Sequence, residues 1–457
     1  MKIIIVGGVA AGAKAAAKSR RLLDNDSEII LYTDDTHVSY SSCGIPYYIQ
    51  NNFTDYKTLL VRSPEEFEAS GVKIKLRHKV IKILPESKQI LVKDLATKSA
   101  SLDYYDKLIL ATGASPVIPN IKNVWYKNIF TVRTIEDAIN IKNKLSTTKR
   151  AVILGGGYIG LEMLEALVRS NIYCVLIERG KYLMSHLDTD MSECVKEQLN
   201  LISENHFNII TEDSVIEFRG DSEGITGVIT ENGLDIDADI AIICAGVRPN
   251  IELATDCGIK IGETGAIFTN NRMETSIRDI YACGDCAETN FAISNTAAWQ
   301  PLGSTANKQG RCAAINACGG DEIFMGVLGS AVTRCLKLSI SMTGLTEKRA
   351  EQLGIPIITS TVTKSDKVGY MPDAKNITVK LIANAENGKL LGGQAVGAGD
   401  TDKRINSLTG AILGGLTVKE FAQNDLTYAP PFSTTIDPLL NAAEILSEKI
   451  TNLKQSD

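Results

Sequence analysis

Two short apolar runs near the start of the chain flank a glycine-rich turn. The first run, Lys2–Val6, leads through the turn into a helix-prone stretch, Ala13–Leu23, and the second run is Glu28–Tyr32. Continuous apolar runs of this length are typical of parallel strands that are buried on both faces. The pattern predicts a strand, a glycine turn, a helix and a second strand.

The same unit recurs in the middle of the chain. A strand at Ala151–Leu154 meets a second glycine turn, followed by a helix at Leu161–Ser170 and a strand at Tyr173–Ile177. Each half also closes on an acidic residue, an apolar strand and a small-residue turn, Asp106–Gly113 and Asp239–Gly246. This internal repeat predicts two tandem Rossmann-like dinucleotide-binding domains.

The pattern changes after the second repeat. Thr275–Glu288 reads as one more strand leading to an acidic turn, and we assign it to the first domain, which becomes discontinuous. Beyond about Gly326, alternating β-branched runs such as Ile377–Ile382 predict an α+β domain. The expected class is therefore α/β with a C-terminal α+β domain. The predicted domains are 1–114 with 247–325, then 115–246, and then 326–457.

Composition narrows the class of protein. The 457 residues are 44% hydrophobic and 22% charged, as in ordinary globular proteins, and the net charge of -6 leaves no basic excess for nucleic acid. No signal-like apolar segment opens the chain, and no run of about 18 apolar residues occurs. Ten scattered cysteines include one C-x-x-C pair, Cys283 and Cys286, without the partners that a zinc site needs. We expect a cytoplasmic protein without a metal or membrane partner.

The second glycine turn carries the full G-x-G-x-x-G spacing at Gly155, Gly157 and Gly160. In this motif the glycines allow a tight turn, close approach of the backbone to a pyrophosphate, and packing of the helix on the strand. Glu178, at the end of the next strand, can accept both ribose hydroxyls and repels a 2′-phosphate. The pattern favours NADH, with NADPH kept as the alternative because Arg179 follows.

The first glycine turn is imperfect, because Val9 stands where the second glycine belongs and Thr33 stands where the second half has Glu178. Asp34 follows Thr33. One such motif alone would be weak, but two copies in matched contexts imply two nucleotides that meet at their reactive ends. FAD with a nicotinamide nucleotide is the common pair.

Cys43 is the leading candidate for redox chemistry. It lies just beyond the second strand, in SYSSCGIPYY, where helix signals resume near Pro46. A sulfur at a helix N-terminus has its thiolate stabilised, which lowers the pKa of the thiol from about 8.5. No second cysteine follows within ten residues, so Cys43 would cycle as a mixed disulfide, persulfide or sulfenic acid. A buried structural cysteine is the alternative.

The motifs GGVAAG, SYSSCGIPYY, ATGAS, GGGYIGLE, AGVRPN, TSIRDIYACGDCAE and YAPPFSTTIDP run through nearly the whole chain. This pattern resembles the single-cysteine flavoprotein disulfide reductases, which include coenzyme A disulfide reductases, coenzyme A persulfide reductases and NADH oxidases. The resemblance implies bound FAD, a nicotinamide electron donor, and a homodimer formed through the C-terminal domain. It also implies that Cys43 lies against the flavin and reduces a small disulfide or persulfide.

The motifs and the resemblance together assign the cofactor residues. For FAD these are Gly7, Gly8, Val9, Ala10, Ala11, Gly12, Thr33, Asp34, Ala111, Thr112, Gly113, Arg133 and Asp285. For the nicotinamide nucleotide they are Gly155, Gly157, Tyr158, Ile159, Gly160, Glu162, Glu178 and Gly246. Tyr158 is expected to cover the nicotinamide site and Glu162 to orient the ring.

The substrate side is assigned by resemblance. Tyr370 and Tyr428 match two tyrosines that serve the reactive cysteine in coenzyme A disulfide reductases, although interface packing is the alternative. The candidate substrate contacts are Lys14, Lys18, Arg21, Ser39 and Ser42. A cationic stripe suits the phosphates of coenzyme A, and a solvated helix face explains it equally well.

Two other functions stay open. An NADH oxidase would reduce oxygen at the flavin, but Ala10 occupies the place where the oxidases and peroxidases carry a histidine. An electron-transfer flavoprotein would instead serve a protein partner. Ser42 and Ile436 also depart from the asparagine and lysine usual in the family, which leaves the identity of the thiol open.

Overall fold

The computed structural model describes residues 1–203 and 205–456, which form two compact units. The first unit comprises residues 1–117, 133–142 and 246–327, and the second comprises 118–132, 143–245 and 328–457. The chain therefore returns to the first unit after residue 245. The three-domain division expected from the sequence remains a proposal, since the second unit contains both a nucleotide-binding sheet and the C-terminal sheet.

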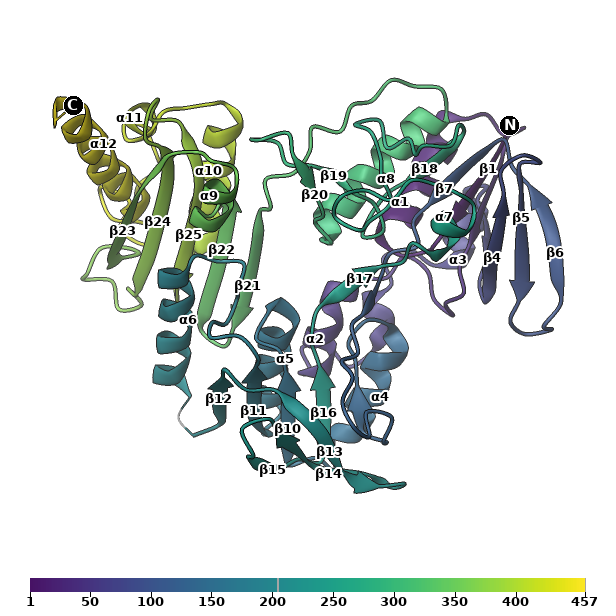
Figure 1. Ribbon diagram of the computed structural model, residues 1–457, viewed down its shortest axis with the longest axis horizontal. Helices are drawn as coiled ribbons and strands as arrows, with labels where there is room; N and C mark the ends of the chain where they lie inside the picture. The colour runs from purple at the N-terminus through teal and green to yellow at the C-terminus, as the bar shows by residue number, and fades with distance from the viewer. Residues whose placement is uncertain (204, 457) are drawn as a thin grey trace. The chain divides into compact units, whose positions relative to one another are not determined.

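The first unit is built on a five-stranded parallel sheet in the order β18-β7-β1-β2-β3 (Figure 1). Its strands are β1 (Lys2–Val6), β2 (Glu28–Tyr32), β3 (Lys73–Lys75), β7 (Lys107–Leu110) and β18 (Ile280–Ala282). Its longer helices are α1 (Ala10–Leu22) and α8 (Gly303–Ala317), and its shorter ones are α2 (Ile45–Ile49), α3 (Pro64–Ala69) and α7 (Glu252–Asp256). Smaller sheets pair β4 (His78–Leu84), β5 (Gln89–Asp94) and β6 (Ala100–Tyr104), then β8 (Ala114–Pro116) with β17 (Val247–Pro249), and β19 (Thr289–Asn290) with β20 (Ala297–Ala298).

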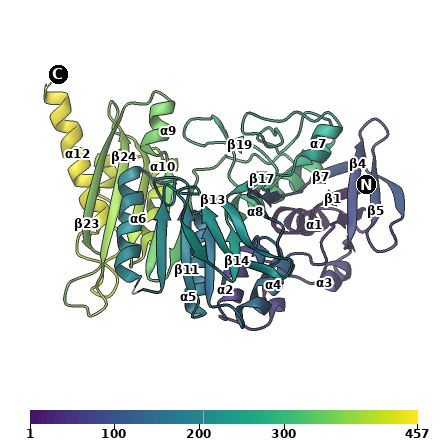
Figure 2. The same ribbon diagram turned by 60° about the horizontal axis from the view of Figure 1, so that its bottom comes forward.

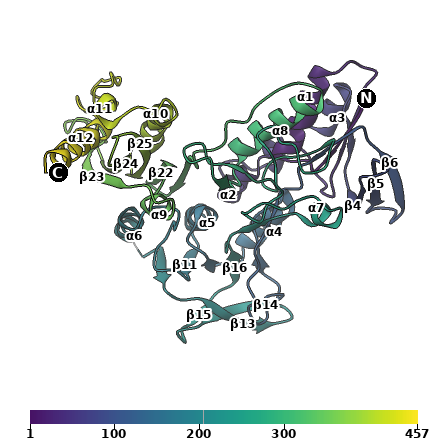
Figure 3. The ribbon, with the colours of Figure 1, turned by 45° about the horizontal axis from the view of Figure 1, so that its top comes forward.

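Both faces of this sheet are buried, which explains its uninterrupted apolar strands. Ile3 and Ile5 face one cluster with the alanines of α1 and α8, which lie side by side (Figure 3). Ile4 and Val6 face the opposite cluster, which includes residues of β4 and β5. Successive side chains of a strand point to opposite faces, so neither face tolerates a polar residue here.

The second unit repeats this plan with a parallel sheet in the order β12-β11-β10-β16-β9. Its strands are β9 (Ile129–Phe130), β10 (Arg150–Leu154), β11 (Tyr173–Glu178), β12 (Phe207–Thr211) and β16 (Ile240–Ile243). Its helices are α5 (Tyr158–Arg169) and α6 (Thr189–Ile202), and a small antiparallel sheet contains β13 (Val215–Asp221), β14 (Gly224–Thr230) and β15 (Asp235–Asp237). The helix α4 (Ile135–Leu145) begins in the first unit and ends in the second.

The C-terminal part of the second unit is an antiparallel sheet in the order β21-β22-β25-β24-β23 (Figure 1), and Figure 2 shows β23 and β24 from a second direction. Its strands are β21 (Ala331–Cys335), β22 (Leu338–Gly344), β23 (Ile357–Ser365), β24 (Asn376–Asn384) and β25 (Leu390–Gly397). Its helices are α9 (Glu347–Gln352), α10 (Thr401–Leu413), α11 (Val418–Phe421) and α12 (Pro438–Ser456). The alternating pattern therefore correctly predicted a different, α+β architecture here.

The predicted strands match the observed ones closely, but both glycine-turn helices begin three residues earlier than predicted. α1 begins at Ala10 instead of Ala13, and α5 begins at Tyr158 instead of Leu161. The third glycine of each motif therefore lies inside the first helical turn. In α1 the sequence pattern hides this because its first residues are alanine and glycine, which give no apolar periodicity.

Candidate functional site

The two glycine turns have the same geometry. Gly7 and Gly155 have φ of 106° and 109°, a conformation that favours glycine. A Cβ on Gly12 would overlap the carbonyl oxygen of Gly7, and a Cβ on Gly160 would overlap that of Gly155. Both third glycines are thus required for close packing of the helix on its own turn.

The middle position of each motif explains why the first copy tolerates valine. Gly157 has no atom within 4 Å of the place where a Cβ would stand, so the backbone there faces open space. Val9 occupies the matching position with φ of -93°, which any residue adopts. Neither α1 nor α5 has a side-chain cap, so their first N–H groups are available to a phosphate. Both turns therefore fit the pyrophosphate of a dinucleotide.

The acidic residue after the second motif is fixed in place. Glu178 accepts hydrogen bonds of 2.7 Å from the backbone N–H of Gly156 and from that of Gly180. Its carboxylate is thereby held against the glycine turn. In the first unit the buried Thr33 accepts from the N–H of Asp35 at 3.3 Å, and the exposed Asp34 lies 3.6 Å from Lys79.

Several predicted flavin residues meet in the first unit. The Arg133 guanidinium donates to Asp285 at 2.9 Å, and a Cβ on Gly113 would lie 3.2 Å from the same guanidinium. Sequence reasoning missed Trp299, which donates to the Asp285 carbonyl at 2.8 Å, and Asn250, which exchanges hydrogen bonds with Thr112. No local motif marks Trp299, and Asn250 ends the motif AGVRPN, but only the fold pairs it with Thr112.

Cys43 is the exposed member of the ten cysteines, all of which lie in the described part of the chain. It lies in a 3₁₀ turn, Ser42–Gly44, that leads directly into α2, so the predicted resumption of a helix is confirmed. Ser39 donates its N–H to the Gly8 carbonyl at 2.8 Å, which ties this segment to the first glycine turn.

The helix α8 also faces the sulfur of Cys43. A Cβ on Gly303, the first residue of α8, would lie 4.0 Å from Cys43 Sγ. α2 has 5 residues and α8 has 15, and α8 has no side-chain cap. The positive end of a helix of this length stabilises an anion. The sequence pointed to α2 and missed α8.

The nicotinamide candidates lie at the start of α5. The ring of Tyr158 stacks on His186 with centroids 5.7 Å apart, and burial raises the pKa of the Tyr158 phenol to about 12. Burial also raises the pKa of Glu162 to about 7, although the Thr333 hydroxyl donates to its carboxylate at 3.1 Å. Ile159 is 36% exposed, and Gly246, with φ of 97°, accepts from the N–H of Val117.

The candidate substrate residues occupy different surroundings. Lys14 and Lys18 are half-buried and Arg21 is exposed on α1, and in the described part of the chain none of the three forms an ion pair. Ser42 is half-buried beside Cys43. In the second unit, Tyr370 is 74% exposed and Tyr428 is 47% exposed.

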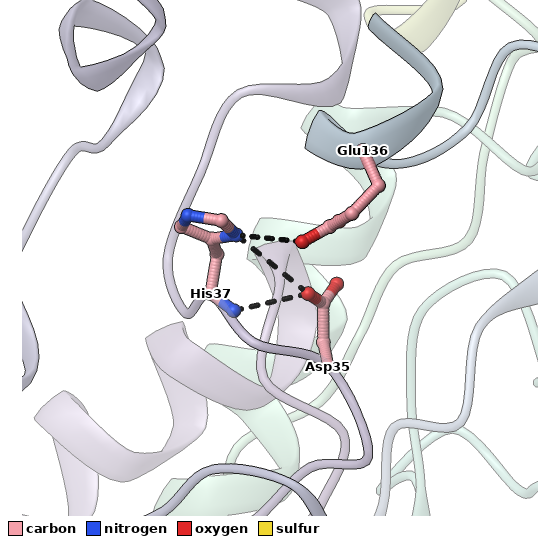
Figure 4. A group of neighbouring side chains, drawn as sticks. All are labelled: Asp35, His37 and Glu136. Carbon is pink, nitrogen blue, oxygen red and sulfur yellow. Dashed lines mark hydrogen bonds and ion pairs between the residues drawn. The ribbon is translucent and has the colours of Figure 1, made fainter. Parts of the chain in front are cut away.

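A cluster not found from the sequence joins the segment before Cys43 to α4 (Figure 4). His37 Nδ1 lies 3.3 Å from a Glu136 carboxylate oxygen and 4.0 Å from one of Asp35. Thr36 donates to the same Glu136 oxygen, and its hydroxyl oxygen lies 3.0 Å from His37 Nδ1. The ligand-type atoms of Asp35, His37 and Glu136 lie close enough together to hold a metal ion. Because the Thr36 hydroxyl contacts both His37 and Glu136, we interpret the cluster as a hydrogen-bond network.

Cys283 and Cys286 flank Asp285 and are fully buried. Burial raises the pKa of the Cys283 thiol well above its ordinary value, and the Cys286 thiol donates to the carbonyls of Leu110 and Cys283. These contacts support a structural role for the pair. None of the helices described is long and apolar enough to cross a membrane.

Comparison with known proteins decides the family. Residues 1–303 match the model of the pyridine nucleotide-disulphide oxidoreductases, and residues 331–439 match the dimerisation domain of the same family. The chain belongs to the pyridine nucleotide-disulphide oxidoreductases. The predicted family, enzyme class and fold class are confirmed, and so are FAD and NAD(P)H as the cofactors of this oxidoreductase.

Relatives of this oxidoreductase carry several names. It is 36% identical over 450 residues to the NAD(P)H coenzyme A polysulfide/persulfide reductase of Pyrococcus horikoshii, covering 97% of this chain and 98% of the relative. It is 34% identical over 463 residues to an NADH oxidase of Methanocaldococcus jannaschii, covering 99% and 100%. The reduced Bacillus anthracis CoADR-RHD crystal structure matches with a TM-score of 0.94 at 34% identity, covering 99% of this chain and 81% of that one.

Proposed function

We propose that this oxidoreductase passes electrons from NAD(P)H through FAD to Cys43, which reduces a low-molecular-weight disulfide or persulfide of the coenzyme A type. The observation that carries the proposal is the exposed residue Cys43, whose sulfur lies beside the uncapped N-terminus of α8, on a segment hydrogen-bonded to the first glycine turn. The names of the Pyrococcus horikoshii and Bacillus anthracis relatives support the substrate class.

The chain's residues fit both nucleotides. The turn Gly7–Gly12 and the pair Arg133 and Asp285 would hold FAD, which supplies a two-electron carrier between the nicotinamide and sulfur when bound. The turn Gly155–Gly160 would hold the NAD(P)H pyrophosphate, and Glu178 would accept from the ribose hydroxyls. NADH is the preferred donor in this proposal because Glu178 is fixed where a 2′-phosphate would be repelled.

The sulfur chemistry belongs to Cys43. Its thiolate attacks one sulfur of the substrate disulfide, so that a Cys43–substrate disulfide forms, the substrate S–S bond breaks and one thiolate leaves. Two electrons from NAD(P)H then cleave the mixed disulfide. The balance is one disulfide, one NAD(P)H and one proton converted to two thiols and NAD(P)⁺. The N-terminus of α8 stabilises the thiolate at both stages.

The remaining candidates have supporting roles. Tyr158, stacked on His186, would cover the nicotinamide site until the nucleotide displaces it, and Glu162 would accept from the carboxamide. The cations on α1 would bind the phosphates of coenzyme A. A homodimer through residues 331–439 would bring Tyr370 and Tyr428 to the reactive cysteine of the second copy, where a phenol can protonate the leaving thiolate.

Anaerobic turnover tests the proposal. NADH oxidation is measured with coenzyme A disulfide and with polysulfide offered separately, for the wild type and for Cys43→Ser. We expect the wild type to reduce at least one sulfur acceptor, and the variant to lose that activity while NADH still bleaches the flavin. If neither acceptor is used, and both proteins reduce oxygen rapidly in a separate aerobic assay, the NADH oxidase function is the correct one.

A further inference from the structure

The helix α4 contacts the Cys43 segment at both of its ends. In the first turn of α4, the Glu136 carboxylate lies 3.3 Å from His37 Nδ1 (Figure 4). The same carboxylate also accepts from the Thr36 hydroxyl. Near the other end of α4, the Lys142 ammonium donates to the carbonyl of Tyr48 at 2.8 Å and to that of Phe53 at 3.3 Å. Cys43 lies in the chain between these two attachments.

The Lys142 attachment caps α2. Tyr48 is in the last turn of α2, where backbone carbonyls have no partner within the helix, and a cation there complements the negative end of the helix dipole. Lys142 Nζ also lies 3.7 Å from the centroid of the Tyr48 ring. Burial of this ammonium lowers the pKa of Lys142 from its ordinary 10.5. Three contacts therefore converge on one side chain at the end of α2.

The segment needs such restraints. α2 has 5 residues, far fewer than the roughly 12–15 that an isolated helix needs for marginal stability. Cys43 itself is exposed and lies in the 3₁₀ turn that leads into this short helix. The same stretch of chain that forms the start of α4 also supplies Arg133, which binds Asp285. The chain that leads into α4 thus contacts Asp285, and α4 itself contacts the segment that carries the sulfur.

From this geometry we propose that α4 is a two-ended clamp, in which Glu136 and Lys142 are positioning residues that hold the sulfur of Cys43 against the N-terminus of α8. The inference rests on the proposed function only in taking Cys43 as the reacting group. Loss of either attachment lets the sulfur move away from the helix end, which weakens the stabilisation of its thiolate and the alignment for attack.

Thiol reactivity tests the clamp without any turnover. The rate at which iodoacetamide alkylates Cys43 is measured against pH in NADH-reduced, flavin-loaded protein, with the modified residue located by peptide mapping. For Lys142→Met, which keeps the side-chain stem, we expect the midpoint of the pH profile to move upward. We also expect kcat with a disulfide acceptor to fall roughly tenfold while KM for NADH is unchanged.

Control variants distinguish a change in the position of Cys43 from a general loss of structure. Lys144→Met lies on the same helix, and the Lys144 side chain forms no hydrogen bond or ion pair in the described residues, so its profile should equal that of the wild type. Lys142→Arg retains a cation that can reach both carbonyls and should restore most of the activity. Glu136→Gln should shift the midpoint of the alkylation profile in the same direction. The shift in the double variant Glu136→Gln/Lys142→Met should be smaller than the sum of the two single shifts, because both changes act on one segment.

The outcomes are distinct for the two proposals. An unchanged alkylation profile and kcat in Lys142→Met would overturn the clamp even if Cys43→Ser is inactive. A shifted profile in Lys142→Met, together with full sulfur reduction by Cys43→Ser, would uphold the clamp and overturn the proposed function. A Lys142→Met protein that unfolds or loses FAD is replaced in the assay by Glu136→Gln, for which an unchanged profile contradicts the clamp equally.

Discussion

Single glycines decide how closely the chain can approach itself or a nucleotide. In the second motif, Gly160 is enclosed by the backbone of its own turn, whereas Gly157 faces open space. The same spacing therefore contains one position that is packed against its own turn and one open position, which we propose serves the ligand. The sequence shows the spacing but not this division of labour, because both positions are simply glycine.

Replacing each glycine by alanine should separate the two roles. Gly160→Ala places a Cβ on the carbonyl of Gly155 and should lower the free energy of unfolding by about 1–3 kcal/mol. Gly157→Ala should leave thermal stability unchanged but raise KM for NADH roughly tenfold, because the new methyl stands where the pyrophosphate approaches. Thermal unfolding and steady-state kinetics measure the two effects. Equal loss of stability in both variants would contradict the assignment of Gly157 to the ligand.

Glu162 should make NADH binding depend on pH. Its pKa of about 7 means that the carboxyl is neutral below this pH and charged above it. The carboxylate is the stronger acceptor for a carboxamide N–H, so KM for NADH should fall as pH rises through about 7. Glu162→Gln should abolish the dependence.

The Thr333 hydroxyl provides the control for this titration. Its hydrogen bond to Glu162 lowers the pKa of that carboxyl. Thr333→Val removes the bond and should move the midpoint of the KM profile upward. If KM for NADH does not change with pH in the wild type, or if the midpoint of its pH profile does not move in Thr333→Val, Glu162 is excluded as the titrating group.

Helices and strands could be predicted from the sequence where a pattern of apolar residues lies within the element itself. β1, β2 and β11 follow directly from continuous apolar runs, since both faces of each sheet are buried. The early starts of α1 and α5 were not predictable, because uncapped helix ends in glycine turns lack the Ser, Thr, Asp or Asn that marks most N-termini. The contact of α8 with Cys43 was equally hidden, since it joins positions about 260 residues apart and only the folded sheet brings them together.

Lys380 on β24 ties two helices to the C-terminal sheet. Its buried ammonium lies 3.3 Å from Asp188, 2.7 Å from Asp190 at the start of α6 and 2.9 Å from Glu347 at the start of α9. Asp188 is also buried and receives hydrogen bonds from Gln394 and from the N–H of Glu347. The three carboxylates of this cluster share one counter-charge, the Lys380 ammonium.

Removal of that cation should be costly. Lys380→Met leaves the Asp188 carboxylate buried without its counter-charge and should destabilise the protein by about 3–5 kcal/mol. Lys389→Met, a change of the same size at an exposed position just before β25, should have almost no effect. Thermal unfolding of the two variants makes the comparison. A small effect at Lys380 would mean that water reaches the cluster.

The whole chain combines two copies of one nucleotide-binding plan with a sheet of another kind. Sequence repeats and motifs sufficed to predict this class and the two cofactors, because each depends on short stretches, and the role of Cys43 stays a prediction. Positions that only the fold connects were missed, among them Trp299, Asn250, Lys142 and the His37 cluster. The roles of Tyr370 and Tyr428 rest on the resemblance, and they depend on a second copy of the chain.

The central claim is that Cys43 attacks the substrate disulfide. The most direct test starts from anaerobic enzyme in which Cys43 is a free thiol and FAD is oxidised, with no NADH present. One equivalent of coenzyme A disulfide is added, and the protein's intact mass and the thiol released are measured. The account predicts one coenzyme A attached per chain, located on Cys43 by peptide mapping, with one thiol released, and no adduct on Cys43→Ser. An adduct on another cysteine, or thiol release by Cys43→Ser at the wild-type rate, would contradict it.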